Sequence, residues 1–62
     1  MILSDLAKII DGDINLEVYD ASGNLVFNDA LAKLNIKDRN RKVLSVAPHH
    51  TSRENYLEVV VY

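Results

Sequence analysis

Apolar and polar residues alternate in two parts of the chain, residues 14–19 and residues 56–62. In the first part, Ile14, Leu16 and Val18 recur with the two-residue period of a strand that buries one face. The second part has the same period, and we expect both to be strands. Residues 41–47 predict a further strand, although apolar residues fall on both of its faces. Pro48 should end that strand because proline has no N–H to donate to a neighbouring strand.

Residues 14–28 predict a β-hairpin. Asp20 can accept hydrogen bonds from the turn backbone, and Gly23 can adopt the left-handed conformation that closes a type I turn with a G1 bulge. Pairing of Asp20 with Asn24 would set the register of the hairpin. The expected opposite residues are Tyr19 with Leu25, Val18 with Val26, Glu17 with Phe27, and Leu16 with Asn28. A slip of one residue would exchange the two faces of one strand, so this register depends on the loop length.

Two helices are expected beside these strands. Apolar residues at helical spacing predict a helix over residues 4–11, with Ser4 as its N-cap and Gly12 just past its end. A shorter helix over residues 30–35 would begin after a cap at Asn28 or Asp29.

The expected order of elements is α-β-β-α-β-β. Two hairpins joined by a short helix predict an α+β fold, a four-stranded antiparallel sheet with helix packed on one face. Residues 1–62 are expected to form a single domain, because so short a chain supports only one core. The expected core residues are Leu3, Leu6, Ile9, Ile10, Ile14, Leu16, Val18, Val26, Leu31, Leu34, Leu44, Val46, Leu57, Val59 and Val61.

The amino-acid composition indicates the cellular compartment in which the protein is expected. There is no cysteine, which fits a reducing compartment, and no apolar run approaches the roughly 20 residues of a membrane span. The first residues have no basic segment before their apolar part, unlike a signal peptide. We therefore expect a cytoplasmic protein that does not associate with a membrane. The net charge of −2 is uneven: residues 1–31 are acidic and residues 32–62 are basic.

The aromatic residues all fall on the side of the predicted sheet that faces away from the predicted core. An apolar patch of this kind usually marks a contact surface, and tyrosine suits such a surface because it combines apolar area with a polar tip. The chain itself could also cover this face, or the predicted register could be wrong. The candidate partner-binding residues are Tyr19, Leu25, Phe27, Tyr56, Val60 and Tyr62.

A basic segment offers a second candidate surface. Its bases could contact phosphate groups, and an aromatic sheet face with flanking bases is typical of single-strand nucleic-acid platforms. The acidic net charge favours a solvated loop instead. The candidate nucleic-acid-binding residues are Lys37, Arg39, Arg41, Lys42 and Arg53. A third hypothesis is that acidic residues mimic nucleic acid toward a basic partner; these residues are Asp5, Asp11, Asp13, Glu17 and Asp20.

Catalytic and metal-binding motifs are weak in this sequence. His49 and His50 are adjacent, so in an extended chain their side chains point opposite ways. Residues 11–15 resemble the start of a calcium loop, but Leu16 stands where that loop needs glycine. No nucleophile turn or glycine-rich phosphate loop is present. We expect no metal, no cofactor and no catalytic residue, and therefore not an enzyme.

Several short motifs resemble small proteins encoded by phages and prophages of Gram-positive bacteria. That group includes inhibitors of host defence, among them anti-CRISPR proteins. The resemblance implies an accessory binding protein in the host cytoplasm. Within that class, inhibition of a host defence protein such as a CRISPR nuclease is a hypothesis. Together with the aromatic face, it predicts a non-catalytic protein–protein interaction module that forms a homodimer; a small nucleic-acid-binding protein is the alternative. The motifs are Leu3-Ser4-Asp5-Leu6, Ile9-Ile10, Ile14-x-Leu16-x-Val18-Tyr19-Asp20-x-x-Gly23-Asn24-Leu25, Arg41-x-Val43-x-Ser45-Val46 and Leu57-x-Val59.

Overall fold

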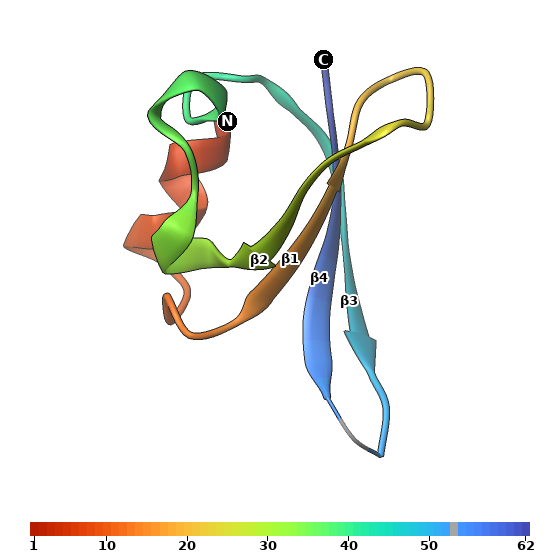
Figure 1. Cartoon of the computed structure of the whole chain (residues 1–62). Helices are drawn as coiled ribbons and strands as arrows, with labels where there is room; N and C mark the ends of the chain where they lie inside the picture. The colour runs from red at the N-terminus through yellow and green to blue at the C-terminus, as the bar shows by residue number, and fades with distance from the viewer. Residues whose placement is uncertain (53) are drawn as a thin grey trace.

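Four strands form one mixed sheet in the computed structural model, which describes residues 1–52 and 54–62 (Figure 1). The strand order is β2-β1-β4-β3. β1 is antiparallel to β2 and parallel to β4, whereas β3 is antiparallel to β4. The strands are β1 (Asn15–Tyr19), β2 (Leu25–Ala30), β3 (Val43–His50) and β4 (Asn55–Val61).

The predicted α+β fold is wrong. The described residues contain no α-helix, only three short 3-10 segments, and the sheet is mixed rather than antiparallel. The two strands with the clearest alternation, β1 and β4, lie side by side at the centre, where Leu16 is opposite Leu57 and Val18 is opposite Val59. This arrangement joins the two most apolar strand faces into one surface. The 3-10 segments are η1 (Leu3–Lys8), η2 (Leu31–Lys33) and η3 (Ile36–Asp38).

Long-range contacts hold the first 3-10 segment, and they explain why it does not form the predicted helix. The backbone N–H groups of Leu3 and Ser4 donate to the carbonyls of Arg41 and Arg39, each over 2.9 Å. The predicted cap, Ser4, is therefore inside the segment, and the Asp5 carboxylate accepts from the Ile2 N–H instead (3.0 Å). Short helices need tertiary contacts to persist, and here those contacts fix a tighter turn.

The predicted hairpin turn is confirmed. The Asp20 N–H donates to the Asn24 carbonyl (2.9 Å), and the Asp20 carboxylate accepts from the backbone N–H groups of Ser22 and Asn24. Gly23 has φ = 88°, a conformation that L side chains strain to adopt. The turn thus fixes the first pair of the hairpin, Tyr19 opposite Leu25, as expected.

Beyond that first pair, the predicted hairpin register is wrong. Val18 lies opposite Phe27 rather than Val26, because the ladder is irregular at this point and Val26 has no direct partner. A bulge of this kind changes which side chains share a face. Both Val26 and Phe27 pack against the core, so the bulge is accompanied by burial of apolar surface, which stabilises the fold. Glu17 consequently lies opposite Asn28, and Leu16 lies opposite Asp29.

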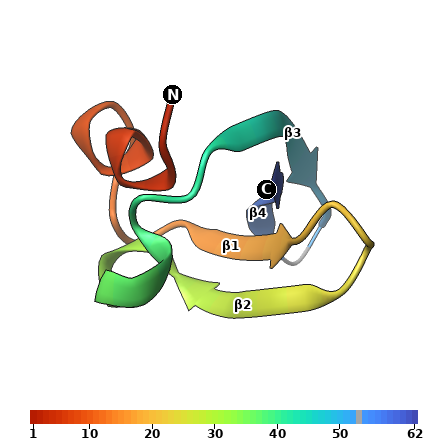
Figure 2. The same cartoon turned by 90° about the horizontal axis from the view of Figure 1, so that it is seen from above.

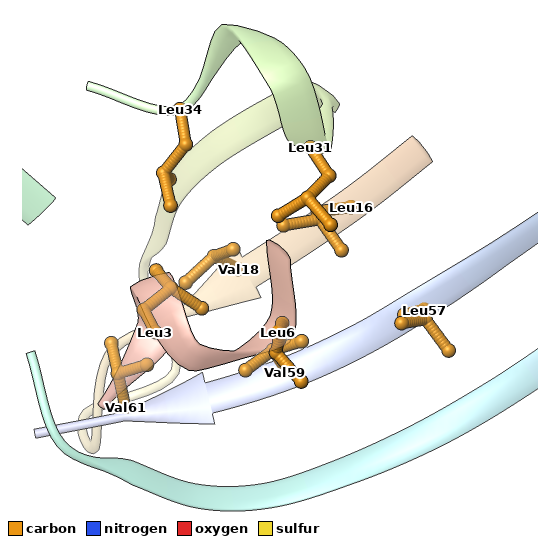
Figure 3. Packing of buried hydrophobic residues seen from close by; sticks show 9 residues of the cluster. All are labelled: Leu3, Leu6, Leu16, Val18, Leu31, Leu34, Leu57, Val59 and Val61. Carbon is orange, nitrogen blue, oxygen red and sulfur yellow. The ribbon is translucent and has the colours of Figure 1, made fainter. Parts of the chain in front are cut away.

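The core lies between the central strands and the 3-10 segments (Figure 3). Nine of the expected core residues are buried; Ile10, Ile14 and Val26 pack against them while only partly buried. Ile9, Leu44 and Val46 were expected in the core but are exposed, Ile9 by 70%. Leu44 lies at an irregularity in edge strand β3, and Ile9 follows η1. The buried residues are Leu3, Leu6, Leu16, Val18, Leu31, Leu34, Leu57, Val59 and Val61.

Strand β3 continues past Pro48 to His50, so the expected end of this strand is also wrong. Because β3 is an edge strand, proline can replace a residue whose N–H has no neighbouring strand to bond. The consequence for the site is that His49 belongs to the sheet and lies opposite Tyr56.

Candidate functional site

The two faces of the sheet differ in what lies against them. In the view from above, the 3-10 segments gather on one side of the central strands (Figure 2). The buried residues of β1 and β4 point to that side, and the intervening residues point to the other. We call this other side the open face. On the described strands it comprises Asn15, Glu17, Tyr19, Leu25, Asn28, Ala30, Ser45, Ala47, His49, Tyr56, Glu58 and Val60.

The register arranges the open face in rows across the sheet. Glu17 lies opposite Glu58, and Tyr19 lies opposite Val60 and Leu25. In each central strand a tyrosine lies two residues from the glutamate, a spacing that keeps both side chains on one face. The centre of the open face is therefore a pair of carboxylates flanked by aromatic rings.

Four of the six predicted partner-binding residues share the open face: Tyr19, Leu25, Tyr56 and Val60. Phe27 does not, because the bulge turns it to the core side, where it lies opposite Val18. Tyr62 follows the end of β4 and is 65% exposed. Its backbone N–H donates to the Lys42 carbonyl (3.0 Å), so it lies beside the end of the basic segment.

Hydrogen bonding and charge couple the polar groups of the open face. The Tyr19 hydroxyl donates to Glu17 Oε1 (2.8 Å). This hydrogen bond raises the pKa of the Tyr19 hydroxyl above its ordinary value of 10.0, and burial and the charges of Glu17 and Glu58 add to the effect. Burial raises the pKa of Tyr56 as well, again with contributions from the charges of Glu17 and Glu58, and with a further one from Glu54. Both tyrosines thus lie in a negative potential.

His49 completes the cluster at the β3 side. Its ring stacks on Tyr56, with centroids 4.8 Å apart and planes within 6°. Its Nε2 lies 2.9 Å from Glu58 Oε2, an ion pair when the imidazole is protonated. A stacked pair of this kind fixes the orientation of the Tyr56 ring.

Sequence patterns did not identify Glu17, Glu58 and His49 as one group. The alternation in residues 14–19 and 56–62 does place each glutamate on the same face as a tyrosine. The missing information was the parallel pairing of β1 with β4, which brings the two glutamates opposite each other. Pairing between distant strands has no local sequence signal.

Two arginines of the basic segment bond to other parts of the fold. Arg39 Nε donates to the Leu34 carbonyl (3.3 Å), and Arg41 Nε donates to the Tyr62 carbonyl (2.7 Å). Arg41 also forms an ion pair with the buried carboxylate of Asp38, 3.5 Å away. Lys37 and Lys42 are exposed, and Arg53 lies outside the described residues. Two of the five candidate nucleic-acid-binding residues therefore have structural partners.

The five acidic residues proposed to mimic nucleic acid do not gather on one surface. The Asp5 carboxylate accepts from the backbone N–H of Ile2, just before η1, and the Asp20 carboxylate accepts from backbone N–H groups of the hairpin turn. Asp11 accepts from the Asp13 N–H (3.0 Å) within another turn. Only Glu17 of this set belongs to the open face.

A groove of about 310 Å³ lies among η1, η2 and the chain that follows them. Its lining includes the buried Leu31 and Leu34 and the exposed Lys8 and Arg39. None of the predicted partner-binding residues lines it. The groove and the open face are therefore separate features.

Among the described residues, no group of three or more histidine, cysteine, aspartate or glutamate side chains is arranged to hold a metal ion. No helix in the described part of the chain is long and apolar enough to cross a membrane. Comparisons with protein-family models, with curated proteins and with solved structures find no match to this chain.

Proposed function

We propose that the protein is a non-catalytic interaction module that binds a protein partner through the open face. The observation that carries this proposal is the set of half-buried tyrosines, Tyr19 and Tyr56, on a face against which no 3-10 segment packs. The core on the opposite face is complete without them. Tyrosines in such a position are typical of protein interfaces, where the ring gains contact area and the hydroxyl keeps a polar partner.

The charge of the open face favours a protein over a nucleic acid. An aromatic sheet face that binds single strands needs bases beside the rings to neutralise phosphates. Here the nearest charged groups in the central strands are Glu17 and Glu58, which would repel a phosphate backbone. The alternative of nucleic-acid binding through the basic segment predicts strongly salt-dependent binding to an oligonucleotide, measured by fluorescence anisotropy.

The resemblance to phage-encoded proteins supports a narrower form of the proposal. In that form the partner is a host defence protein, such as a CRISPR nuclease, in the host cytoplasm. Adding the protein to a DNA-cleavage reaction of such a nuclease tests this form directly. Inhibition by the wild type that is lost with Tyr19→Ala/Tyr56→Ala supports it, whereas cleavage unaffected by the wild type contradicts it for that nuclease.

A peptide titration tests the proposal without knowledge of the natural partner. Short extended peptides of cationic, neutral and anionic composition are added while the aromatic ring resonances of Tyr19 and Tyr56 are followed by NMR. We expect at least one composition to shift both rings, and Tyr19→Ala/Tyr56→Ala to abolish that binding while the protein stays folded. The control is Ile36→Ala, because Ile36 is 80% exposed and lies in η3, away from the open face. If no peptide shifts either ring, the proposal is wrong.

The homodimer expected from the sequence is a special case of the same proposal. Sedimentation over a range of concentrations gives the mass in solution. A dimer that Tyr19→Ala/Tyr56→Ala dissociates would identify a second copy as the partner, and a dimer unaffected by that change would place the dimer contact elsewhere.

A further inference from the structure

The central strands of the open face carry two negative charges and no basic residue. None of the four strands contains a lysine or an arginine. Glu17 and Glu58 are directly opposite each other in neighbouring strands, about 4.8 Å apart at the backbone as in any sheet. Among the described residues of the open face, the one group that can carry a positive charge is His49, which lies at the β3 edge beside Glu58. The centre of the open face is therefore anionic.

This pairing departs from the usual chemistry of a sheet. Like charges directly opposite each other destabilise a strand pair, and opposite charges or apolar groups stabilise it. Natural sequences break such local rules mainly at functional sites. A cation placed between the two carboxylates would relieve the repulsion, so the pair favours a cationic ligand.

The aromatic rings beside the carboxylates indicate which cation fits. Tyr19 follows Glu17 by two residues on β1, and Tyr56 precedes Glu58 by two residues on β4, so a ring flanks the pair from each strand. A guanidinium group stacks on aromatic faces, and its five N–H donors can serve two carboxylates at once. An ammonium group has three donors and no planar face. The apolar Leu25 and Val60 lie in the row of Tyr19, where they can contact an aliphatic stem.

Resting on the function proposed above, we propose that the open face binds an arginine side chain presented by the protein partner, with its guanidinium group between Glu17 and Glu58 and against the Tyr19 and Tyr56 rings. Charge complementarity favours an arginine, because none of the four strands places a lysine or an arginine beside these two acids. The partner residues on either side of this arginine would lie along the strands of the open face and add contact area.

The test compares four peptides that differ at one position. The parent peptide is acetyl-Ala-Val-Arg-Val-Ala-amide, and the others replace its arginine with lysine, with citrulline (the uncharged isostere) or with glutamate. Affinities come from the shifts of the Tyr19 and Tyr56 ring resonances. We expect the arginine peptide to bind at least about tenfold more tightly than the citrulline peptide, more tightly than the lysine peptide, and the glutamate peptide not to bind.

Two variants with equal net charge isolate the role of the glutamates. In Glu17→Gln/Glu58→Gln we expect affinity for the arginine peptide to fall by about tenfold or more. The matched control is Asp13→Asn/Asp29→Asn, which removes two exposed acids outside the open face and should change the affinity by no more than about twofold. Urea unfolding confirms that each variant is folded.

The outcomes separate this inference from the proposed function. Equal binding of the arginine and citrulline peptides, or of the arginine and lysine peptides, overturns the inference while leaving a protein-binding face. Unchanged affinity in Glu17→Gln/Glu58→Gln overturns it in the same way. If none of the four peptides, nor any of the broader set above, shifts the two tyrosine rings, the proposed function fails as well.

Discussion

The two faces of the sheet are built from the same central strands, yet their chemistry is opposite. On the core side, Leu16, Val18 and Val59 are completely buried against the 3-10 segments. On the open face, the residues between them in the chain include Glu17 and Glu58, opposed and of like charge. On the core side the central strands pair apolar residues with apolar residues, whereas on the open face they pair two like charges. Alternate residues of the same two strands therefore belong to the buried core and to the open face.

The largest effect is expected in the core. Leu16→Ala should lower the free energy of unfolding by about 2–5 kcal/mol, because it removes a fully buried side chain and leaves a cavity. For a domain of this size such a loss approaches the whole stability. Urea unfolding measures the effect. If Tyr19→Ala lowered the free energy of unfolding as much as Leu16→Ala does, the assignment of the two faces would be contradicted, since Tyr19 would then be a core residue.

Phe27→Ala tests whether Phe27 belongs to the core side or to the open face. The structure places Phe27 on the core side, packed against the buried cluster, so its removal should cost about 1–3 kcal/mol. Binding of peptides to the open face should be unchanged. The register expected from the sequence makes the reverse prediction, lost binding with an intact core, and measuring stability and affinity on one sample decides between them.

The open face should also respond to alkaline pH. The raised pKa of Tyr19 means that folding favours the neutral hydroxyl, which donates to Glu17. The stabilisation is fully present below the ordinary pKa of about 10 and is lost as the pH rises through the higher folded pKa. In Glu17→Gln the pKa of Tyr19 should move down toward its ordinary value, as measured by the ultraviolet absorbance of the phenolate. An unchanged titration would mean that the hydrogen bond to Glu17 does not control this group.

Local patterns in the sequence were enough for part of the fold. The Asp20–Asn24 turn, the central strands and the nine buried apolar residues follow from residue type and spacing alone. These features depend on neighbours within a few positions, which is why a pattern reveals them. Ile9 shows the limit of such local patterns. Helical spacing predicted that it is buried, but η1 ends at Lys8 and Ile9 is exposed.

The rest depends on contacts between distant residues. Parallel pairing of β1 with β4 joins residues about 40 positions apart, and it decides both the fold class and the meeting of Glu17 with Glu58. The bulge at Val26 moved Phe27 to the core, a change that loop length could not indicate. The candidate site was therefore predictable as an aromatic surface, but its anionic centre was not.

The most direct test of the account is the free energy of unfolding of Glu17→Gln/Glu58→Gln, measured in urea at neutral pH. If the two carboxylates are kept for a partner, their repulsion is a cost to the free protein, and the variant should be more stable than the wild type by about 0.2–1 kcal/mol. A variant less stable than the wild type would contradict the account, because it would show that the carboxylates hold the sheet together and are not reserved for binding.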